Sequence, residues 1–201
     1  MRSRSLIIHL VLRSALALLW LGVPTLVPCL RAAPQANSVE IDTATATAAY
    51  LLNFLRFTEW PAAARPATEA APYVIGVSGS RALLDALILV VEGKKVRGHP
   101  VYIVRLKTLS DLATCHLAYF NPTPDEDGMS VLIPTALDAL RDKPVLTVSP
   151  ATDFIAQGGL VQLFLADSLL RFDIDGVSAR RANLAINSRL LALAWPVPIL
   201  P

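Results

Sequence analysis

Cysteine and histidine are scarce in this sequence, which has two of the first and three of the second among 201 residues. Such a set does not supply the ligands of a zinc site. The Gly-x-Ser-x-Gly elbow of serine hydrolases is also missing. The stretch Gly76-Val77-Ser78-Gly79 follows an apolar run but lacks the third glycine of a dinucleotide loop. The acidic stretch at residues 125–128 lacks the ligand spacing of a calcium loop. We therefore expect no catalytic site, no cofactor and no metal.

Acidic residues are absent before Glu40, and this N-terminal region has the features of a secretory signal peptide. Basic residues precede an apolar stretch that two prolines interrupt, so it is too short for a membrane span of about 20 residues. Small residues at Ala32 and Ala33 suit cleavage. We predict a signal peptide over residues 1–33, export from the cytoplasm and no stable membrane span after processing. The alternative is lipidation at Cys29, although Pro28 before it fits a lipoprotein box poorly.

Removal of this leader reverses the sign of the net charge, because the leader carries four arginines and no acid. The balance moves from 18 basic against 16 acidic residues to 14 against 16, so the formal net charge changes from +2 to −2. The basic character of the whole chain therefore gives no reason to expect nucleic-acid binding. One cysteine, Cys115, remains after processing.

Short apolar runs alternate with helical patterns along the rest of the chain. We expect a polar, mobile segment over 34–44, one domain over 45–195 and a proline-rich tail over 196–201. Helices are predicted at 45–59, 81–91 and 134–140, and strands at 73–77, 101–105, 115–120 and 145–149. This rhythm indicates an α/β sandwich with a mainly parallel sheet and helices on both faces. Runs at 160–165 and 169–174 lie three residues apart, which predicts an antiparallel C-terminal hairpin, followed by a helix from Asp175 or Ser178.

An aromatic segment at residues 50–61 is the most informative stretch, because aromatic residues make up only 6% of the chain. Periodic spacing predicts a helix whose aromatic face packs in the core, and Pro61 should end it near Trp60. The alternative is that Tyr50, Phe57 or Trp60 faces a second subunit or a partner.

Polar side chains near the C-terminus form a second candidate surface. Arg171 and Asp173 alternate with apolar residues, so they share one face of the last predicted strand. Arg180, Arg181 and Asn183 follow on the next helix. A solvated helix face explains these residues, and a recognition surface for a protein or an acidic ligand is the alternative.

Taken together, the ordered motifs resemble the YfiR-like family of periplasmic proteins from about Ala46 to Ala194. The resemblance is carried by Phe57-Thr58-Glu59-Trp60-Pro61, Val74-Ile75-Gly76-Val77, Gly98-His99-Pro100-Val101, Cys115-His116-Leu117-Ala118-Tyr119-Phe120, Gly158-Gly159, Leu170-Arg171-Phe172-Asp173-Ile174-Asp175 and Ser188-Arg189-Leu190-Leu191.

The resemblance implies a small α/β domain, often dimeric and without known catalytic activity. It implies a repressor that holds a membrane-bound diguanylate cyclase inactive and so lowers cyclic di-GMP and biofilm formation. A sensor kinase is another signalling partner of the kind the family serves. Some relatives carry cysteine pairs linked to redox control, whereas Cys115 has no mature partner for a disulfide switch. The alternative function is a periplasmic sensor that binds a ligand or the cell wall.

Overall fold

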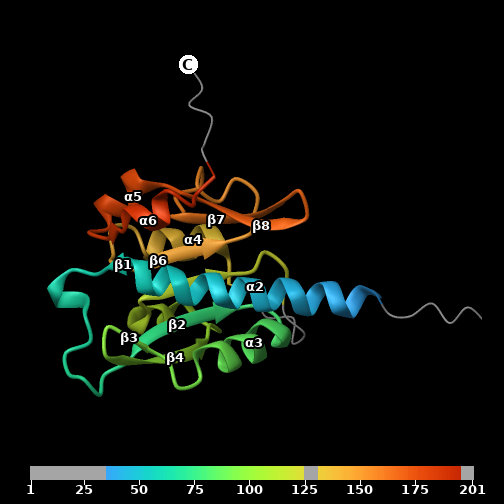
Figure 1. The fold of residues 1–201 in the computed structure, drawn as a ribbon. Helices are drawn as coiled ribbons and strands as arrows, with labels where there is room; N and C mark the ends of the chain where they lie inside the picture. The colour runs from blue at the N-terminus through green and yellow to red at the C-terminus, as the bar shows by residue number, and fades with distance from the viewer. Residues whose placement is uncertain (1–34, 125–130, 196–201) are drawn as a thin grey trace, which may run out of the picture. The chain divides into compact units, whose positions relative to one another are not determined.

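One central sheet organises the fold (Figure 1). The computed structural model describes residues 35–124 and 131–195. Within them, seven strands lie in the order β3-β4-β2-β5-β6-β7-β8. Strands β4, β2, β5, β6 and β7 are parallel, while β3 and β8 are antiparallel to their neighbours. Their bounds are β2 Tyr73–Ser78, β3 Lys95–Val96, β4 His99–Arg105, β5 Leu117–Phe120, β6 Leu146–Ser149, β7 Val161–Ala166 and β8 Leu169–Ile174. The predicted mixed α/β sheet is confirmed.

Capping residues or a first-turn proline mark the start of the helical connections between the parallel strands. Helix α3 (Arg81–Val91) starts at Ser80, whose hydroxyl accepts a hydrogen bond from the Leu83 N–H at 3.4 Å. The 3-10 helix η2 (Leu109–Thr114) has a capping box between Thr108 and Asp111. Helix α4 (Ile133–Ala139) carries a proline in its first turn, where the missing N–H costs nothing.

The C-terminal hairpin forms as the sequence predicts. Strands β7 and β8 pair in register from Val161 opposite Ile174 to Ala166 opposite Leu169. Asp167 and Ser168 make the turn with φ angles of +52° and +61°. A two-residue turn with both φ values positive matches the twist of antiparallel strands. After β8, Asp175 caps helix α5 (Gly176–Arg181) by accepting from the Val177 and Ser178 N–H groups.

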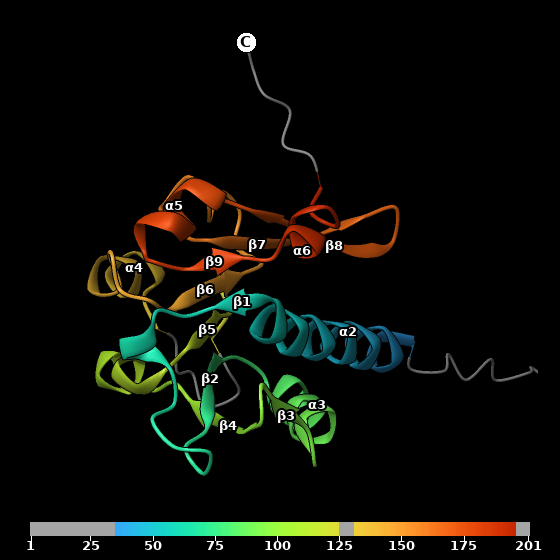
Figure 2. The ribbon, with the colours of Figure 1, turned by 60° about the vertical axis from the view of Figure 1, so that its left-hand side comes forward.

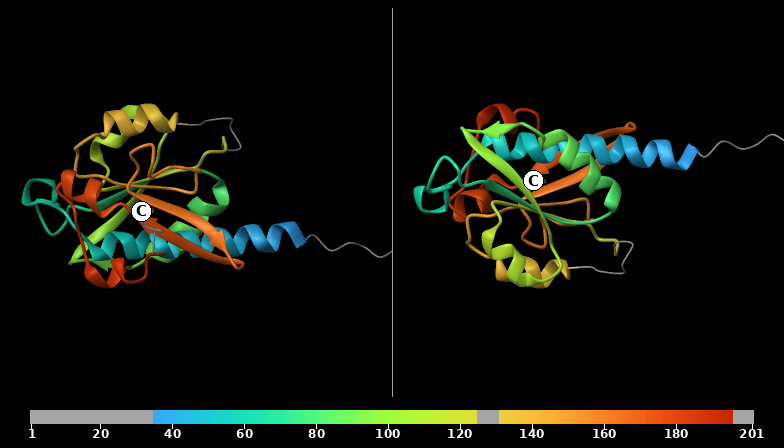
Figure 3. Two further views of the ribbon diagram at one scale, coloured as in Figure 1. Left: turned by 90° about the horizontal axis from the view of Figure 1, so that it is seen from above. Right: turned by 90° about the horizontal axis from the view of Figure 1, so that it is seen from below.

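Two apolar clusters lie on opposite faces of the sheet, and Figure 3 shows the helices on these two faces. The larger cluster joins helices α2 (Gln35–Phe57), α3, α5 and α6 (Ser188–Leu191) to the sheet through buried residues such as Phe54, Leu87 and Phe172. The smaller cluster packs η2 and α4 on the other face around Phe120 and Phe154. Helices therefore cover both faces, as predicted.

The first helix differs from its prediction at both ends. Helix α2 begins at Gln35, ten residues before the predicted start at Thr45, and it ends at Phe57. Its early start has a physical reason, because the segment after Pro34 has no glycine or proline and contains good helix formers such as Ala36 and Glu40. Glu59 is therefore not on the helix, contrary to the predicted span of 45–59.

Two short strands follow from the early helix end. Thr58 and Glu59 form β1, which pairs antiparallel with β9 (Ala185–Ile186) to make a separate two-stranded sheet within the described residues (Figure 2). A 3-10 helix, η1 (Ala62–Ala64), comes next. Strands β1, β3 and β9 have two residues each, so no period-two pattern could reveal them. The predicted signal peptide, Cys29, residues 125–128 of the acidic loop and the 196–201 tail lie outside the described residues.

Candidate partner-binding site

The candidate site is built on β1, which links the end of α2 to the core. Thr58 pairs with Ile186 and Glu59 with Ala185. The Asn187 N–H, just after β9, donates to the Phe57 carbonyl at 2.9 Å. The segment that carries β9 therefore also bonds the end of α2. Alternation along β1 turns Thr58 inward, at 0% exposure, and Glu59 outward, at 52% side-chain exposure.

Trp60 follows β1 and packs in the core, at 2% exposure. Its ring lies 5.4 Å from the ring of Tyr73 and 5.9 Å from that of His116. His116 Nδ1 accepts a hydrogen bond from the Val74 N–H at 3.1 Å, so the bonded nitrogen carries no proton. Burial lowers the pKa of His116 from 6.5, although a hydrogen bond with the Ala64 backbone opposes this shift. A neutral imidazole therefore packs edge-on against the Trp60 ring.

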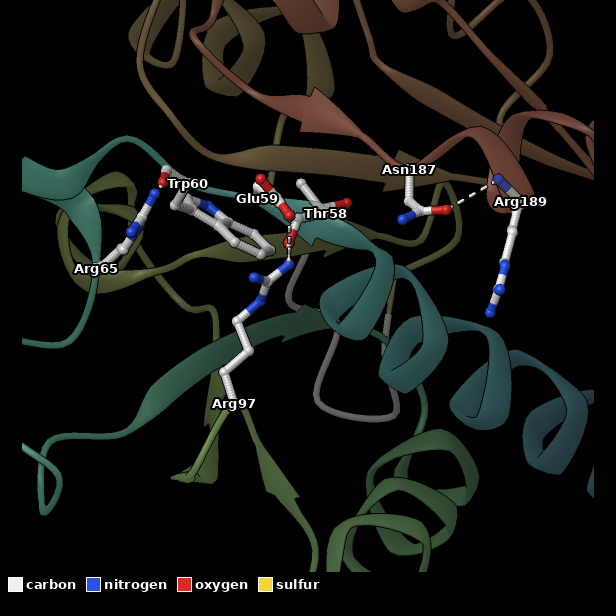
Figure 4. Close-up of polar contacts among 7 residues, drawn as sticks. All are labelled: Thr58, Glu59, Trp60, Arg65, Arg97, Asn187 and Arg189. Carbon is white, nitrogen blue, oxygen red and sulfur yellow. Dashed lines mark hydrogen bonds and ion pairs between the residues drawn. The ribbon is translucent and has the colours of Figure 1, made fainter.

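Polar side chains surround β1 on its exposed side (Figure 4). Arg97 donates to the Thr58 carbonyl and to the Glu59 carboxylate, both at 3.3 Å. Arg65 Nε donates to the Trp60 carbonyl at 2.8 Å. We call this region the β1 surface and define it by the exposed residues that Figure 4 draws around the strand: Glu59, Arg65, Arg97, Asn187 and Arg189.

Electrostatics make the β1 surface basic, because it holds three arginines and one glutamate. The Arg97–Glu59 pair is 43% and 52% exposed, so it contributes little to stability. Asn187 caps α6 through the Arg189 N–H at 2.9 Å and leaves the Arg189 guanidinium pointing away from that bond (Figure 4). Exposed guanidinium groups of this kind suit the recognition of carboxylates on another protein.

The predicted aromatic site residues are mostly committed to internal packing. Tyr50 is half-buried, its ring stacks on Phe54 and meets Phe172 edge-on, and its hydroxyl donates to the Leu170 carbonyl at 3.0 Å. Phe57 is also half-buried and packs on the larger cluster. Together with the buried Trp60, these contacts favour the core interpretation of the aromatic segment. A direct role of the three residues in partner binding stays a prediction.

The predicted strand pair Arg171 and Asp173 lies on β8, and both side chains are half-buried. The Arg171 guanidinium stacks over the Trp195 ring at 5.5 Å, which is a cation–π contact. Burial raises the pKa of Asp173, although a hydrogen bond from the Ile174 N–H opposes the shift. Arg171 is therefore held by the C-terminal segment.

The site residues predicted on the helix after β8, namely Arg180, Arg181 and Asn183, are exposed, and their neighbours differ from those of Arg171. Arg180 and Arg181 lie in the last turn of α5, and Asn183 follows with a φ of +56°. Arg181 lines a cavity below α5, whereas Arg180 does not. Arg171 contacts Trp195 instead. The two predicted groups thus have different neighbours, and their role in recognition stays a prediction.

Two members of the β1 surface were not found from the sequence. Arg97 sits in the tight turn between β3 and β4, at φ +51°, and reaches β1 across 38 positions of sequence. Arg65 follows an alanine-rich stretch with no periodic pattern. The only available signal was charge in a turn, which by itself indicates solvation.

Cys115 is unsuited to nucleophilic chemistry. Burial, assisted by the charge of Asp111, raises the pKa of the Cys115 thiol to about 11, so it stays protonated at neutral pH. The thiol packs in the smaller cluster, whereas His116 packs against Trp60 and Tyr73 on the other side. These two neighbours, which precede β5, therefore point toward opposite faces of the sheet. Within the described residues, no helix is both long and apolar enough to cross a membrane.

Comparison with known proteins gives one family match. A family model described as YfiR/HmsC-like matches residues 44–195, which is most of the chain. No curated protein matches. Among solved structures, a crystal structure of a conserved domain protein from Vibrio cholerae O1 biovar eltor str. N16961 is 13% identical, with a TM-score of 0.39. That match covers 60% of this chain and 53% of the other, so the chain spans about half the length of that protein. At this score the likeness carries no argument.

Proposed function

Because the chain belongs to the YfiR/HmsC-like family, we propose that it binds the periplasmic portion of a membrane-bound diguanylate cyclase and holds that enzyme inactive. The family is one of periplasmic regulators of cyclic di-GMP signalling. For this protein we infer a diguanylate cyclase as the partner, repression as the direction of control and the β1 surface as the contact.

The observation that carries the proposal is the exposed, basic β1 surface mounted on a rigid base. Glu59 and Arg97 are exposed to solvent. Thr58 on β1 and Trp60 just after it are buried in the core and hold the strand in place. A surface fixed in this way loses little conformational freedom when a partner docks. Its arginines would attract an acidic patch on the partner and speed the encounter at low salt.

Repression then follows from differential binding. A cyclase that exchanges between inactive and active arrangements is shifted toward the arrangement to which the repressor binds more tightly. The repressor needs no chemistry of its own for this effect. The buried, protonated Cys115 thiol and the neutral His116 ring are consistent with such a role.

Deletion of the gene tests the function. We expect cyclic di-GMP and surface attachment to rise, and expression of the intact protein to restore both. Unchanged cyclic di-GMP in the deletion strain would overturn the assignment of a cyclase partner. A homodimer, which the family resemblance implies, is also proposed, and sedimentation equilibrium of the purified protein would test it.

A further inference from the structure

A cavity outside the β1 surface has the composition of a small-ligand site. It has a volume of about 390 Å³ and lies between the end of α4, the start of β6, the segment before β7 and α5. Its apolar lining includes Leu140, Val145 and Leu160, which are 6%, 8% and 5% exposed. Volumes of this order hold small organic ligands in other proteins.

Cationic side chains stand at the rim of this cavity. Arg141, Lys143 and Arg181 line it and are exposed, and Asp142 is the one carboxylate among the lining residues. The Arg141 guanidinium is paired with Asp138 at 2.5 Å. Within the described part of the chain, Lys143 and Arg181 form no ion pair, although the Asp175 carboxylate lies within electrostatic reach of Arg181. Two cations at the rim are therefore available to a ligand.

The neutral polar groups of the cavity are already used by the protein. The Thr147 hydroxyl accepts from the Leu160 N–H at 3.0 Å, and the Ser178 hydroxyl donates to the Asp175 carboxylate. Gln157 donates its side-chain N–H to the Thr152 carbonyl at 3.2 Å. The apolar floor and the cationic rim are thus the main features that the cavity offers to a ligand, and together they favour an anion that carries a hydrocarbon portion.

We propose that this cavity binds an amphipathic organic anion, with its carboxylate held by Lys143 and Arg181 and its apolar portion on Leu140, Val145 and Leu160. The site does not depend on the proposed cyclase partner, because it concerns a different set of residues from the β1 surface. A small molecule bound in this cavity would act on the protein independently of the cyclase partner.

Octanoate is a suitable probe, with octanamide and inorganic phosphate as comparisons. Each is titrated into the purified ¹⁵N-labelled protein while backbone amide shifts are followed. We expect octanoate to produce saturable shifts at Leu160, Ala182 and Lys143. Octanamide, which lacks the charge, and phosphate, which lacks the chain, should each bind about tenfold more weakly or worse.

Arginine variants on the same helix provide the matched control. Arg181→Ala should weaken octanoate binding about tenfold, since it removes a charge-assisted contact. Arg180→Ala makes the same charge change on an exposed residue that does not line the cavity, and it should leave the affinity unchanged.

Three results would overturn the site. They are an absence of octanoate-dependent shifts around the cavity, equal affinity for octanamide or phosphate, and equal losses in the two arginine variants. None of them bears on cyclic di-GMP, so failure here is distinct from failure of the proposed function.

Discussion

Thr58 combines complete burial with an unused hydroxyl group. Its side chain is 0% exposed, and its Oγ1 has no hydrogen-bond partner among the described residues. An unpaired buried hydroxyl costs free energy, and valine has a similar shape and a higher strand preference. We expect Thr58→Val to raise the free energy of unfolding by about 1 kcal/mol, measured by urea denaturation. A loss of stability would instead show that the hydroxyl has a partner, such as a buried water molecule.

His116 should make stability depend on pH. Its pKa is lowered from 6.5 in the folded protein, mainly by burial, so the unfolded chain binds more protons as the pH falls below 6.5. The contribution of the neutral ring is therefore complete above pH 6.5 and is lost as the pH falls toward the folded pKa. We expect His116→Asn, which keeps an acceptor for the Val74 N–H, to flatten the fall in stability that accompanies a drop in pH below 6.5. An unchanged slope in urea titrations would show that another group controls it.

Single-residue features were predictable from the sequence only where local geometry decides them. The predicted strand 115–120 begins only at Leu117, but the alternation assumed for it still gives the opposed directions of Cys115 and His116. The Ser80 cap follows from its place before an apolar helix. The contact of Arg97 with Glu59 could not be predicted, because it joins a turn to a strand 38 positions away. The sequence alone does not indicate which distant group an arginine side chain will contact.

Among the structural elements, the segment before β7 depends on one glycine. A Cβ atom at Gly159 would lie 2.2 Å from the Phe154 ring, which is too close for any side chain. Phe154 is 0% exposed and packs in the smaller cluster, so its ring cannot move away without disturbing buried neighbours. We expect Gly159→Ala to lower the free energy of unfolding by about 1–3 kcal/mol, measured by thermal or chemical denaturation.

Two further variants make the Gly159 prediction specific. Gly79→Ala is the matched control, because its Cβ would meet neighbours only at 3.6 Å or more and should cost much less. Adding Phe154→Leu to Gly159→Ala should recover part of the loss, since the smaller side chain relieves the overlap. Equal losses in the two glycine variants would rule out the clash as the cause.

Elements with a clear period were predictable, and very short elements were not. Helix α3 has the predicted bounds Arg81–Val91, and the β7–β8 hairpin lies where its short connection placed it. Strands β1 and β9 have two residues each, and their pairing is set by the early end of α2 at Phe57. The β1 surface depends on these short strands, so the sequence pattern could not reveal it.

At the scale of the whole folded domain, the sheet brings together segments that are distant in sequence. The β1 surface takes Glu59 from β1, Arg97 from the β3–β4 turn and Asn187 from the segment after β9. The alternating pattern of strands and helices predicted the layers, because each element must bury one face. It could not predict which loops meet beyond the sheet, since those contacts contribute little to the hydrophobic pattern.

The central claim is that the β1 surface holds a cyclase inactive, and charge reversal at Arg189 tests it most directly. Arg189 is exposed, so Arg189→Glu should change the free energy of unfolding by less than about 0.5 kcal/mol. Lys107→Glu makes the same charge change on an exposed loop residue outside the β1 surface and serves as the control. The measurement is cyclic di-GMP in a deletion strain that expresses each protein. We predict that wild type and Lys107→Glu lower cyclic di-GMP while Arg189→Glu leaves it at the deletion level. Full repression by a folded Arg189→Glu protein would contradict the account.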